Sequence, residues 1–380
     1  MPLSTPIHLR SVFRSRSPWL ACPLVLVALF ALDALLFNTG LYSHLLEPES
    51  TSGRFEMILG RERIAQQRNG DDLVALLGDS RFGCQPRIAN ELTPQTGLVF
   101  RNAGIAGSDA RTWYYMMRDL DPTAQRYRAL LIAVNTYYDE DEYIRHDNDI
   151  RALHYCIARL RFSDVLSFAL SFHDPSIRWE AFRGALFKGI VYQADIQAFL
   201  SHPQTRLSDL RRDRAGIEEW TYNYVETDAS MTGFTVDWAT HTPTFPPGAD
   251  QNQKDTVRDS FIRELPPQDG RDHAFRSEWY GKIANRYRNS PTKIIFLRLP
   301  DGPLPRPENL DPRNTSSILE LAKRPNVLLF PEHAFDSLER PELFKDGAHL
   351  NRGGVTLFSK MVAQGVAAML GTAPKAEGEK

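Results

Sequence analysis

Five short apolar runs lie along the chain, and each ends at turn-forming or polar residues. Their apolar residues are continuous rather than alternating, which is typical of strands that are buried on both faces. Helical patterns separate several of these runs, and the alternation predicts an α/β fold with three layers, in which helices cover both faces of a mainly parallel sheet. The expected strands are residues 73–77, 98–102, 129–134, 293–299 and 327–330.

Three stretches between and after these runs have the composition of helices. The last one has a clear beginning, because Asn351 is a good N-cap residue and Leu350 can pack against Val355 across the cap. It ends the α/β pattern and leaves only a short polar tail. The expected helices are residues 109–120, 277–289 and 352–370.

A long stretch between the third and fourth strands interrupts the pattern. Residues 144–276 begin with a helical-looking part and end in a Pro-, Thr- and Asp-rich part around residues 240–255. A connection of this length without strand signals is typical of an insertion or lid rather than of a loop. We therefore expect a mostly helical or irregular insertion at 144–276, flanked by the two parts of the α/β domain at 73–143 and 277–371.

An apolar segment precedes the α/β pattern. Residues 19–37 would form a helix of roughly 28 Å at ~1.5 Å per residue, close to the ~30 Å hydrocarbon core of a bilayer. Asp33 opposes insertion by up to roughly 3 kcal/mol, whereas each Leu, Val or Phe favours it by about 0.3 to 0.6 kcal/mol. The segment holds eleven such residues, and Asp33 lies near its far end. We therefore expect a transmembrane anchor.

The charges that flank this segment predict its orientation. Arginines precede it and glutamates follow it, so the positive-inside rule places the amino terminus in the cytoplasm and the α/β domain outside. A cleavable signal peptide is the alternative, but the alanines at 28, 31 and 34 form no A-x-A cleavage site. The flanking charged residues are Arg10, Arg14, Arg16, Glu47 and Glu49.

The remaining segments complete the expected organisation. A basic cytoplasmic tail covers residues 1–18, and a polar, partly helical stalk at 38–72 leads from the anchor into the α/β domain. The polar segment 372–380 is expected to be a disordered tail.

Composition excludes some classes of protein and leaves others open. Lys and Arg number 45 against 47 Asp and Glu, so the chain lacks the overall positive charge of a nucleic-acid-binding protein. Cys22 falls inside the predicted anchor. Cys84 and Cys156 would lie in an oxidising compartment, where a disulfide and two buried thiols are both open alternatives.

Two separate motifs supply groups suited to nucleophilic catalysis. The first strand ends at Gly78-Asp79-Ser80, which would place a hydroxyl at the carboxyl edge of the sheet, where open α/β folds bind their ligands. Asp346 and His349 stand together just before the last helix. An imidazole can accept the proton of the Ser80 hydroxyl, and a carboxylate can orient that imidazole. The alternative to catalysis is a structural role for both residues: Ser80 would only form a turn or a cap, and Asp346 would only cap the turn before the last helix.

An acyl-transfer site also needs donors for an oxyanion. The second strand is followed by a loop with Gly104 and Gly107, and the third strand is followed by Asn135. The alternative to an oxyanion hole is again structural: Gly104 and Gly107 would only shape a tight turn, and Asn135 would only close one. No Walker or dinucleotide-binding motif occurs, and the histidines have no metal-ligand spacing, so we predict no cofactor and no metal.

With these motifs the chain resembles the SGNH, or GDSL-type, hydrolase superfamily. The superfamily has a series of conserved sequence blocks. Gly78-Asp79-Ser80 resembles the first block, residues 102–107 the second, Asn135 the third and Asp346-Gly-Ala-His349 the fifth. The resemblance implies Ser80 as nucleophile, His349 as base and Asp346 as its orienting carboxylate. It also implies an oxyanion hole made by the N–H groups of Ser80 and Gly107 and the amide of Asn135.

The resemblance covers residues 73–135 and 293–370, leaves the insertion unexplained and has two departures. The usual third block is Gly-x-Asn-Asp, but here Asn135 is followed by Thr136. The first block continues with Arg81 instead of leucine. The residue that follows Asn135 therefore differs from the one in the usual third block.

A membrane anchor before such a domain resembles a bacterial subset of the superfamily that acts in O-acetylation of cell-envelope or exopolysaccharide sugars. The resemblance implies a single-pass inner-membrane protein with a periplasmic serine esterase or O-acyltransferase domain, working beside a multi-pass membrane-bound O-acyltransferase on a polysaccharide. The alternative is a non-catalytic scaffold that keeps the fold and binds the polysaccharide or the membrane acyltransferase.

Overall fold

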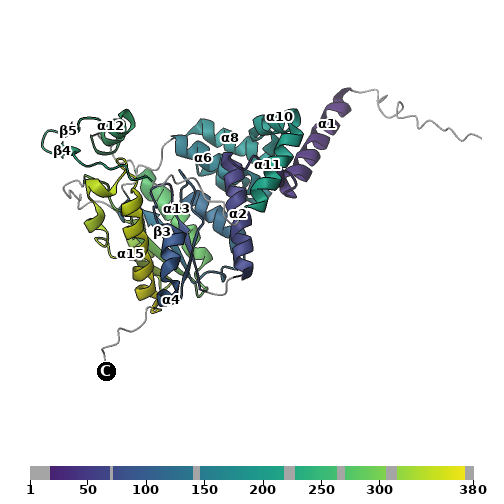
Figure 1. Cartoon of the computed structure of the whole chain (residues 1–380). Helices are drawn as coiled ribbons and strands as arrows, with labels where there is room; N and C mark the ends of the chain where they lie inside the picture. Colours follow the sequence, from purple (N-terminus) through teal and green to yellow (C-terminus); the bar gives the residue numbers. More distant parts are fainter. Residues whose placement is uncertain are drawn as a thin grey trace, which may run out of the picture. The chain divides into compact units, whose positions relative to one another are not determined.

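The computed structural model describes most of the chain and divides it into two compact units (Figure 1). The first unit combines residues 18–47 with 157–207, and the second contains the other described residues from 48 onward. The predicted basic tail, up to residue 17, and the tail from residue 373 lie outside the described residues. These are residues 18–68, 72–139, 146–217, 227–262, 270–304 and 315–372.

A five-stranded parallel sheet forms the centre of the second unit, which confirms the predicted α/β fold. The strand order is β2-β1-β3-β6-β7. The chain winds to one side from β1 to β2 and to the other side from β3 onward, so the winding reverses between β1 and β3. In open α/β sheets the ligand crevice lies at this position, outside the carboxyl ends of the strands. The strands are β1 (Leu73–Leu77), β2 (Val99–Asn102), β3 (Ala129–Val134), β6 (Lys293–Arg298) and β7 (Val327–Leu329).

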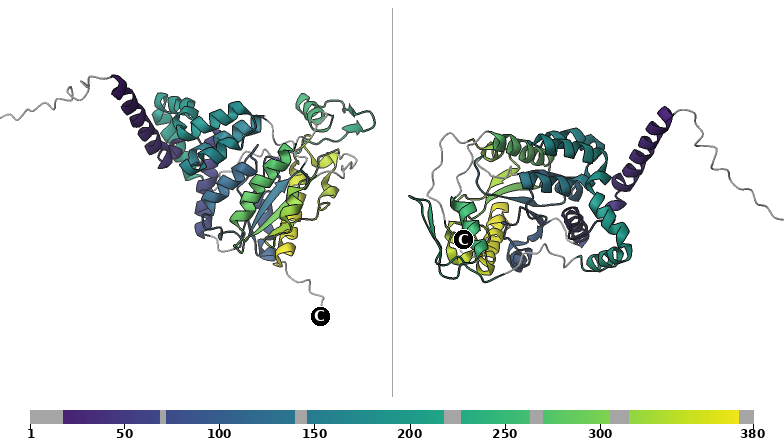
Figure 2. Two further views of the ribbon diagram at one scale, coloured as in Figure 1. Left: turned by 180° about the vertical axis from the view of Figure 1, so that it is seen from behind. Right: turned by 90° about the horizontal axis from the view of Figure 1, so that it is seen from above.

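Helices pack on both faces of this sheet (Figure 2). On one face, Tyr280 of α13 (Arg271–Arg286) meets the ring of Phe296 in β6 edge-on at 5.1 Å, and α13 contacts α5 (Ala110–Leu120). On the other face, Ile295 shares a buried cluster with Phe358 of α15 (Arg352–Leu370). Neighbouring residues of β6 thus point to opposite layers, as the continuous apolar run requires.

Side-chain caps fix the ends of two of the predicted helices. Asn351 accepts a hydrogen bond from the N–H of Gly354 at 3.1 Å, so α15 begins where its cap predicted. Asp109 accepts one from the N–H of Thr112 at 2.9 Å and caps α5. Helix α13 begins earlier than the predicted residue 277, because its first turn, from Arg271, is polar and adds nothing to the apolar pattern.

Residues 38–72, expected as a stalk, contain α2 (Thr51–Arg68). Phe55, Ile58 and Leu59 of this helix are buried, and α2 contacts α5 and α6 (His146–Cys156). Cys84 and Cys156 are free buried thiols in this unit, and burial raises the pKa of Cys84 to about 12. The other helices of the second unit include α3 (Pro86–Ala89), α4 (Thr93–Thr96), α12 (Gln251–Val257) and α14 (Ser317–Leu321), beside the hairpin β4 (Thr235–Asp237) and β5 (Thr242–Thr244).

The first unit is helical and includes part of the predicted insertion. Helix α1 (Pro18–Asp33) continues into a π-helical turn at Ala34–Asn38. Its Asp33 carboxylate accepts hydrogen bonds from the N–H groups of Lys188 (3.0 Å) and Gly189 (2.7 Å). The carboxylate is therefore satisfied by backbone donors of the same unit. The other helices are α7 (Val165–Leu170), α8 (Pro175–Leu186), α9 (Lys188–Val191), α10 (Gln193–Ser201) and α11 (Pro203–Ala215), which continues into the second unit.

A long apolar helix and a shorter one bear on the expected membrane span. Within the described residues only α15 is long and apolar enough to cross a bilayer, and it is a core helix of the α/β unit. A shorter apolar helix, Cys22–Asn38, falls in the predicted anchor. The anchor and its orientation stay predictions.

Candidate active site

The loop after β1 holds Ser80 against the loop after β2. The N–H of Ile105 donates to the carbonyl of Gly78 at 3.1 Å, so the two loops are joined by a backbone hydrogen bond. A Cβ atom on Gly104 would lie 2.5 Å from that same carbonyl oxygen. Gly104 is therefore required by the close approach of the two backbones. Ser80 lies in the turn that follows, partly exposed at the carboxyl edge of the sheet.

Ser80, His349 and Asp346 come together although the chain separates them widely. His349 Nε2 lies 3.0 Å from Ser80 Oγ, and His349 Nδ1 lies 3.0 Å from Asp346 Oδ1. The hydroxyl, the imidazole and the carboxylate thus form a continuous hydrogen-bonded series. This is the geometry in which an imidazole accepts a serine proton while a carboxylate fixes the ring.

The charge on Asp346 favours the useful tautomer of His349. Burial by itself raises the pKa of Asp346, but the hydrogen bond and charge of His349 and the N–H groups of Ala348 and His349 outweigh burial and lower it. Those N–H groups donate to Asp346 Oδ1 at 2.9 and 2.8 Å. An ionised Asp346 holds the proton on Nδ1 of His349, which leaves Nε2 free to accept the Ser80 proton.

Part of the predicted insertion packs directly against the Asp-x-x-His loop. Gln253 of α12 donates from Nε2 to the carbonyl of Lys345 at 3.2 Å. A Cβ atom on Gly347 would lie 2.9 Å from Thr256 Cγ2, so α12 also closes over the middle of this loop. The sequence analysis did not single out Gln253. Its only signal was the Asp250-x-x-Gln253 pattern of a helix start, which the structure shows as a capping box.

Gly107, a predicted oxyanion donor, lies in the loop that packs on the Ser80 loop. Its φ of +64° is a left-handed conformation that favours glycine, and a Cβ there would lie 2.4 Å from Arg151 Nη1. The next residue, Ser108, donates from Oγ to the carbonyl of Gly78 at 3.3 Å and accepts from Trp113 Nε1 at 2.8 Å. This small network fixes the loop beside Ser80.

Asn135, the other predicted oxyanion donor, directly follows β3. The preceding carbonyl of Val134 accepts a hydrogen bond from the N–H of Leu299 at 2.7 Å, which fixes the end of the strand. Since β3 is the neighbour of β1, Asn135 and Ser80 extend from the same edge of adjacent strands. Asn135 is partly buried there, and its role as a donor stays a prediction.

Arg81, which departs from the family pattern, is paired with Asp79. Its Nη2 donates to Asp79 Oδ2 at 2.9 Å, and its backbone N–H donates to Asp79 Oδ1, also at 2.9 Å. The carboxylate thus closes a tight turn around Ser80. Sequence analysis treated Arg81 only as a departure, although Asp79 is a turn-forming residue whose side chain can accept from the backbone N–H two residues later.

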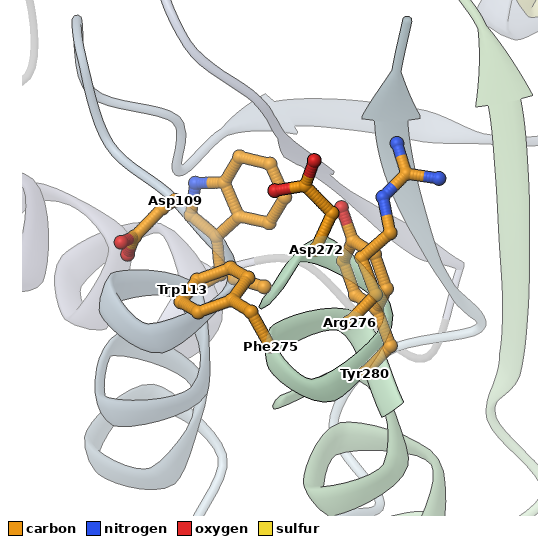
Figure 3. Close-up of a pocket in the computed structure, with 7 residues that line it drawn as sticks. Asp109, Trp113, Asp272, Phe275, Arg276 and Tyr280 are labelled. Atoms are coloured by element: carbon orange, nitrogen blue, oxygen red, sulfur yellow. The ribbon is translucent and has the colours of Figure 1, made fainter. Parts of the chain in front are cut away.

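A small pocket lies between α5 and α13 (Figure 3). It encloses about 290 Å³, including the part open to solvent. Ser80 and His349 do not line it, but Trp113 connects it to the loop that carries Ser80 through Ser108. Figure 3 shows the carboxylate of Asp109 pointing away from Asp272 and Arg276, towards the start of α5. The lining residues are Asp109, Ala110, Trp113, Asp272, Phe275, Arg276 and Tyr280.

A second carboxylate–imidazole pair follows β3 and has a structural role. His273 Nδ1 lies 2.8 Å from Asp139 Oδ2, and the same carboxylate accepts from the backbone N–H of Ser317 at 3.0 Å. The hydroxyl of Ser317 contacts Nδ1 of His273 at 3.3 Å. A serine on the same ring nitrogen as the carboxylate cannot be deprotonated in the manner of Ser80. Asp139 instead ties the start of α14 to α13.

Among the residues that the structure describes, no group of three or more His, Cys, Asp or Glu is arranged to hold a metal ion. No family model matches the chain, and no curated protein is significantly similar to it. The function must therefore be argued from the site itself.

Proposed function

We propose that the protein is a membrane-anchored serine esterase or O-acyltransferase of the SGNH type, which handles acetyl esters of a cell-envelope or exopolysaccharide sugar in the periplasm. The observation that supports it most is the 3.0 Å contact between His349 Nε2 and Ser80 Oγ, with Asp346 behind the imidazole. Distant parts of the chain have no structural need to meet in this order at the ligand edge of a parallel sheet.

In the proposed reaction, Ser80 Oγ attacks the acyl carbon while His349 Nε2 takes its proton. The N–H groups of Ser80 and Gly107 and the amide of Asn135 stabilise the negative oxygen of the tetrahedral intermediate. When the intermediate collapses, His349 returns the proton to the leaving alcohol and the acyl group remains on Ser80. A sugar hydroxyl or water then attacks the acyl-enzyme, gives its proton to His349, and Ser80 recovers it as the product leaves.

The substrate class rests on the resemblance and on the predicted anchor. A nucleophile held outside the membrane would meet envelope polysaccharides, whose hydroxyls are acceptors and whose acetyl esters are donors for the same chemistry. A multi-pass membrane-bound O-acyltransferase is the partner that the resemblance implies. Transfer and hydrolysis differ only in whether a sugar hydroxyl or water attacks the acyl-enzyme.

A non-catalytic scaffold is the second candidate, because Asn135 is followed by Thr136 where the family pattern has aspartate. A protein that only binds a polysaccharide needs no reactive serine. The two candidates therefore differ in the reactivity of Ser80.

Covalent labelling of the full-length protein in detergent with a fluorophosphonate tests this difference. We expect wild type to be labelled at Ser80 and Ser80→Ala to remain unlabelled with nearly unchanged thermal stability. Ser167→Ala is the matched control, since this exposed serine of α7 donates to the carbonyl of Asp164, and it should be labelled like wild type. A folded wild-type protein that takes no label would contradict the enzyme and favour the scaffold.

A further inference from the structure

Exposed apolar side chains are concentrated in one of the two units. Among the residues that the structure describes, 18 large apolar side chains are exposed, and 16 of them belong to the unit of residues 18–47 and 157–207. The α/β unit is much larger and contributes only Leu319 and Leu357. Such a concentration marks an interaction surface rather than the scattered apolar residues of an ordinary protein surface.

The predicted anchor accounts for only part of this surface. The exposed side chains between Leu24 and Leu36 lie in the anchor segment and would face lipid. Leu41 follows the anchor segment, and the remaining seven, on residues 157–207, lie outside that segment and need another explanation. They are Phe162, Leu166, Leu170, Trp179, Ile190, Leu200 and Leu207.

Helix α7 is apolar on two opposite faces. Val165, Phe168 and Ala169 are buried and form its inner face. Leu166 and Leu170 are 64% and 62% exposed, and they lie one helical turn apart on the outer face. Apart from the exposed Ser167, both sides of this helix are therefore apolar, which is typical of an element with an apolar medium on its outer side.

The outer face of α7 continues the apolar surface of α1. Phe162, 49% exposed, precedes Leu166 by one further turn, and we call Phe162, Leu166 and Leu170 the apolar stripe. The ring of Phe162 lies 5.6 Å from the ring of Phe30 in α1. Phe30 is seven residues before the end of the predicted anchor at Phe37, a rise of roughly 10 Å along a helix. The stripe therefore begins at the depth of the outer acyl chains.

We propose that residues 157–207 dock on the outer face of the bilayer that α1 crosses, with the apolar stripe inserted among lipid acyl chains. This inference rests on the membrane anchor of the proposed function. Trp179 of α8 fits the same arrangement, because it is 61% exposed and tryptophan is enriched at membrane interfaces. The bonds from Lys188 and Gly189 to Asp33 hold α1 to this set of helices, so the stripe keeps its position beside the anchor.

Lipid quenching of a fluorophore tests the proposal in full-length protein reconstituted into phosphatidylcholine vesicles. An environment-sensitive NBD group is attached to Leu166→Cys, and in a second protein to Leu170→Cys, both in a Cys22→Ser background. Cys84 and Cys156 are buried and will not compete for the label. Leu26→Cys in α1 reports on the anchor. Leu357→Cys is the matched control, an exposed leucine of the α/β unit.

A nitroxide on the lipid acyl chain should quench NBD at positions 26, 166 and 170, with a blue-shifted emission, and leave position 357 unchanged. Quenching at 26 alone, with 166 and 170 open to aqueous iodide, would overturn the docking and keep the anchor; the stripe would then be free for a protein partner. Loss of quenching at 26 as well would mean that the anchor fails. Equal quenching at 357 would overturn the assignment to this unit.

Discussion

The Asp346 carboxylate serves the site in two ways, as an acceptor for the N–H groups of Ala348 and His349 and as the partner of the imidazole. Asp346→Asn keeps an oxygen for the backbone donors but offers an N–H to Nδ1 of His349, which favours the wrong tautomer. Turnover of an acetyl ester should fall by about 10⁴ in a protein that still folds.

The matched control is Asp336→Asn, because Asp336 and His333 also pair, at 2.9 Å, but their side chains are exposed, by 47% and 60%. It should keep wild-type turnover.

The lowered pKa of Asp346 makes the stability of the fold depend on pH. The stabilisation by the ionised carboxylate is present above the ordinary carboxyl pKa and is lost as pH falls through the lower folded value. Asp346→Asn should therefore weaken the acid-side pH dependence of the melting temperature. Near-normal turnover of Asp346→Asn would remove Asp346 from the mechanism.

Which residues could be predicted depended on how local their signals are. Ser80, Asp346 and His349 carry signals within a few positions of a strand end or a helix start, so the sequence was sufficient to bring them into one hypothesis. The pairing of Asp139 with His273 joins positions with no shared motif, because their meeting depends on how α13 packs beside the end of β3. Only the folded chain reveals it.

Gly104 makes the packing of the β1 and β2 loops testable. A Cβ atom there would meet the carbonyl oxygen of Gly78 at 2.5 Å, so Gly104→Ala must push back the loop that carries Ser80. We expect a destabilisation of about 1–3 kcal/mol, measured by urea unfolding, together with a loss of fluorophosphonate labelling.

Gly281→Ala is the control for that change. Gly281 lies within α13, and a Cβ there would have no atom within 4 Å. Alanine should stabilise the helix by up to about 1 kcal/mol and leave labelling intact. If Gly104→Ala were as stable and as reactive as wild type, the two loops would not be in the contact described.

Strands and long helices were predictable because burial leaves a pattern in the chain. The observed strands fall within the five apolar runs, and α15 has the predicted ends. The short helices of residues 157–207 could not be delimited in this way. In α7 both faces are apolar, so the sequence shows no periodic boundary between a buried side and an outer side.

Asp33 links the arrangement of the helical unit to a single side chain. Asp33→Ala would leave the N–H groups of Lys188 and Gly189 without their acceptor, at a cost of about 0.5–2 kcal/mol. Amide hydrogen exchange at 188 and 189 should become faster in detergent-solubilised protein. Asp33→Asn keeps an oxygen acceptor and should exchange more slowly than Asp33→Ala. Unchanged protection in the alanine variant would contradict this contact.

The grouping of residues 18–47 with 157–207 could not be foreseen from the sequence. The sequence analysis treated the carboxylate of Asp33 as a cost to membrane insertion, whereas the structure gives it backbone donors from a segment more than 150 positions later. A lone carboxylate at the end of an apolar run was the available signal. Nothing in the sequence indicated its partners, the N–H groups of Lys188 and Gly189, because α9 is short and carries no motif.

The chain passes between the two units three times, at residues 47/48, 156/157 and 207/208. A protease that cut only the first of these junctions would sever the direct covalent link to α1 but would not release the α/β unit, because residues 157–207 would still hold the detached helix through Asp33. Release of the α/β unit therefore requires a second event, the separation of α1 from residues 157–207. Stability of this non-covalent assembly, rather than one peptide bond, would govern how long the α/β unit stays attached to α1.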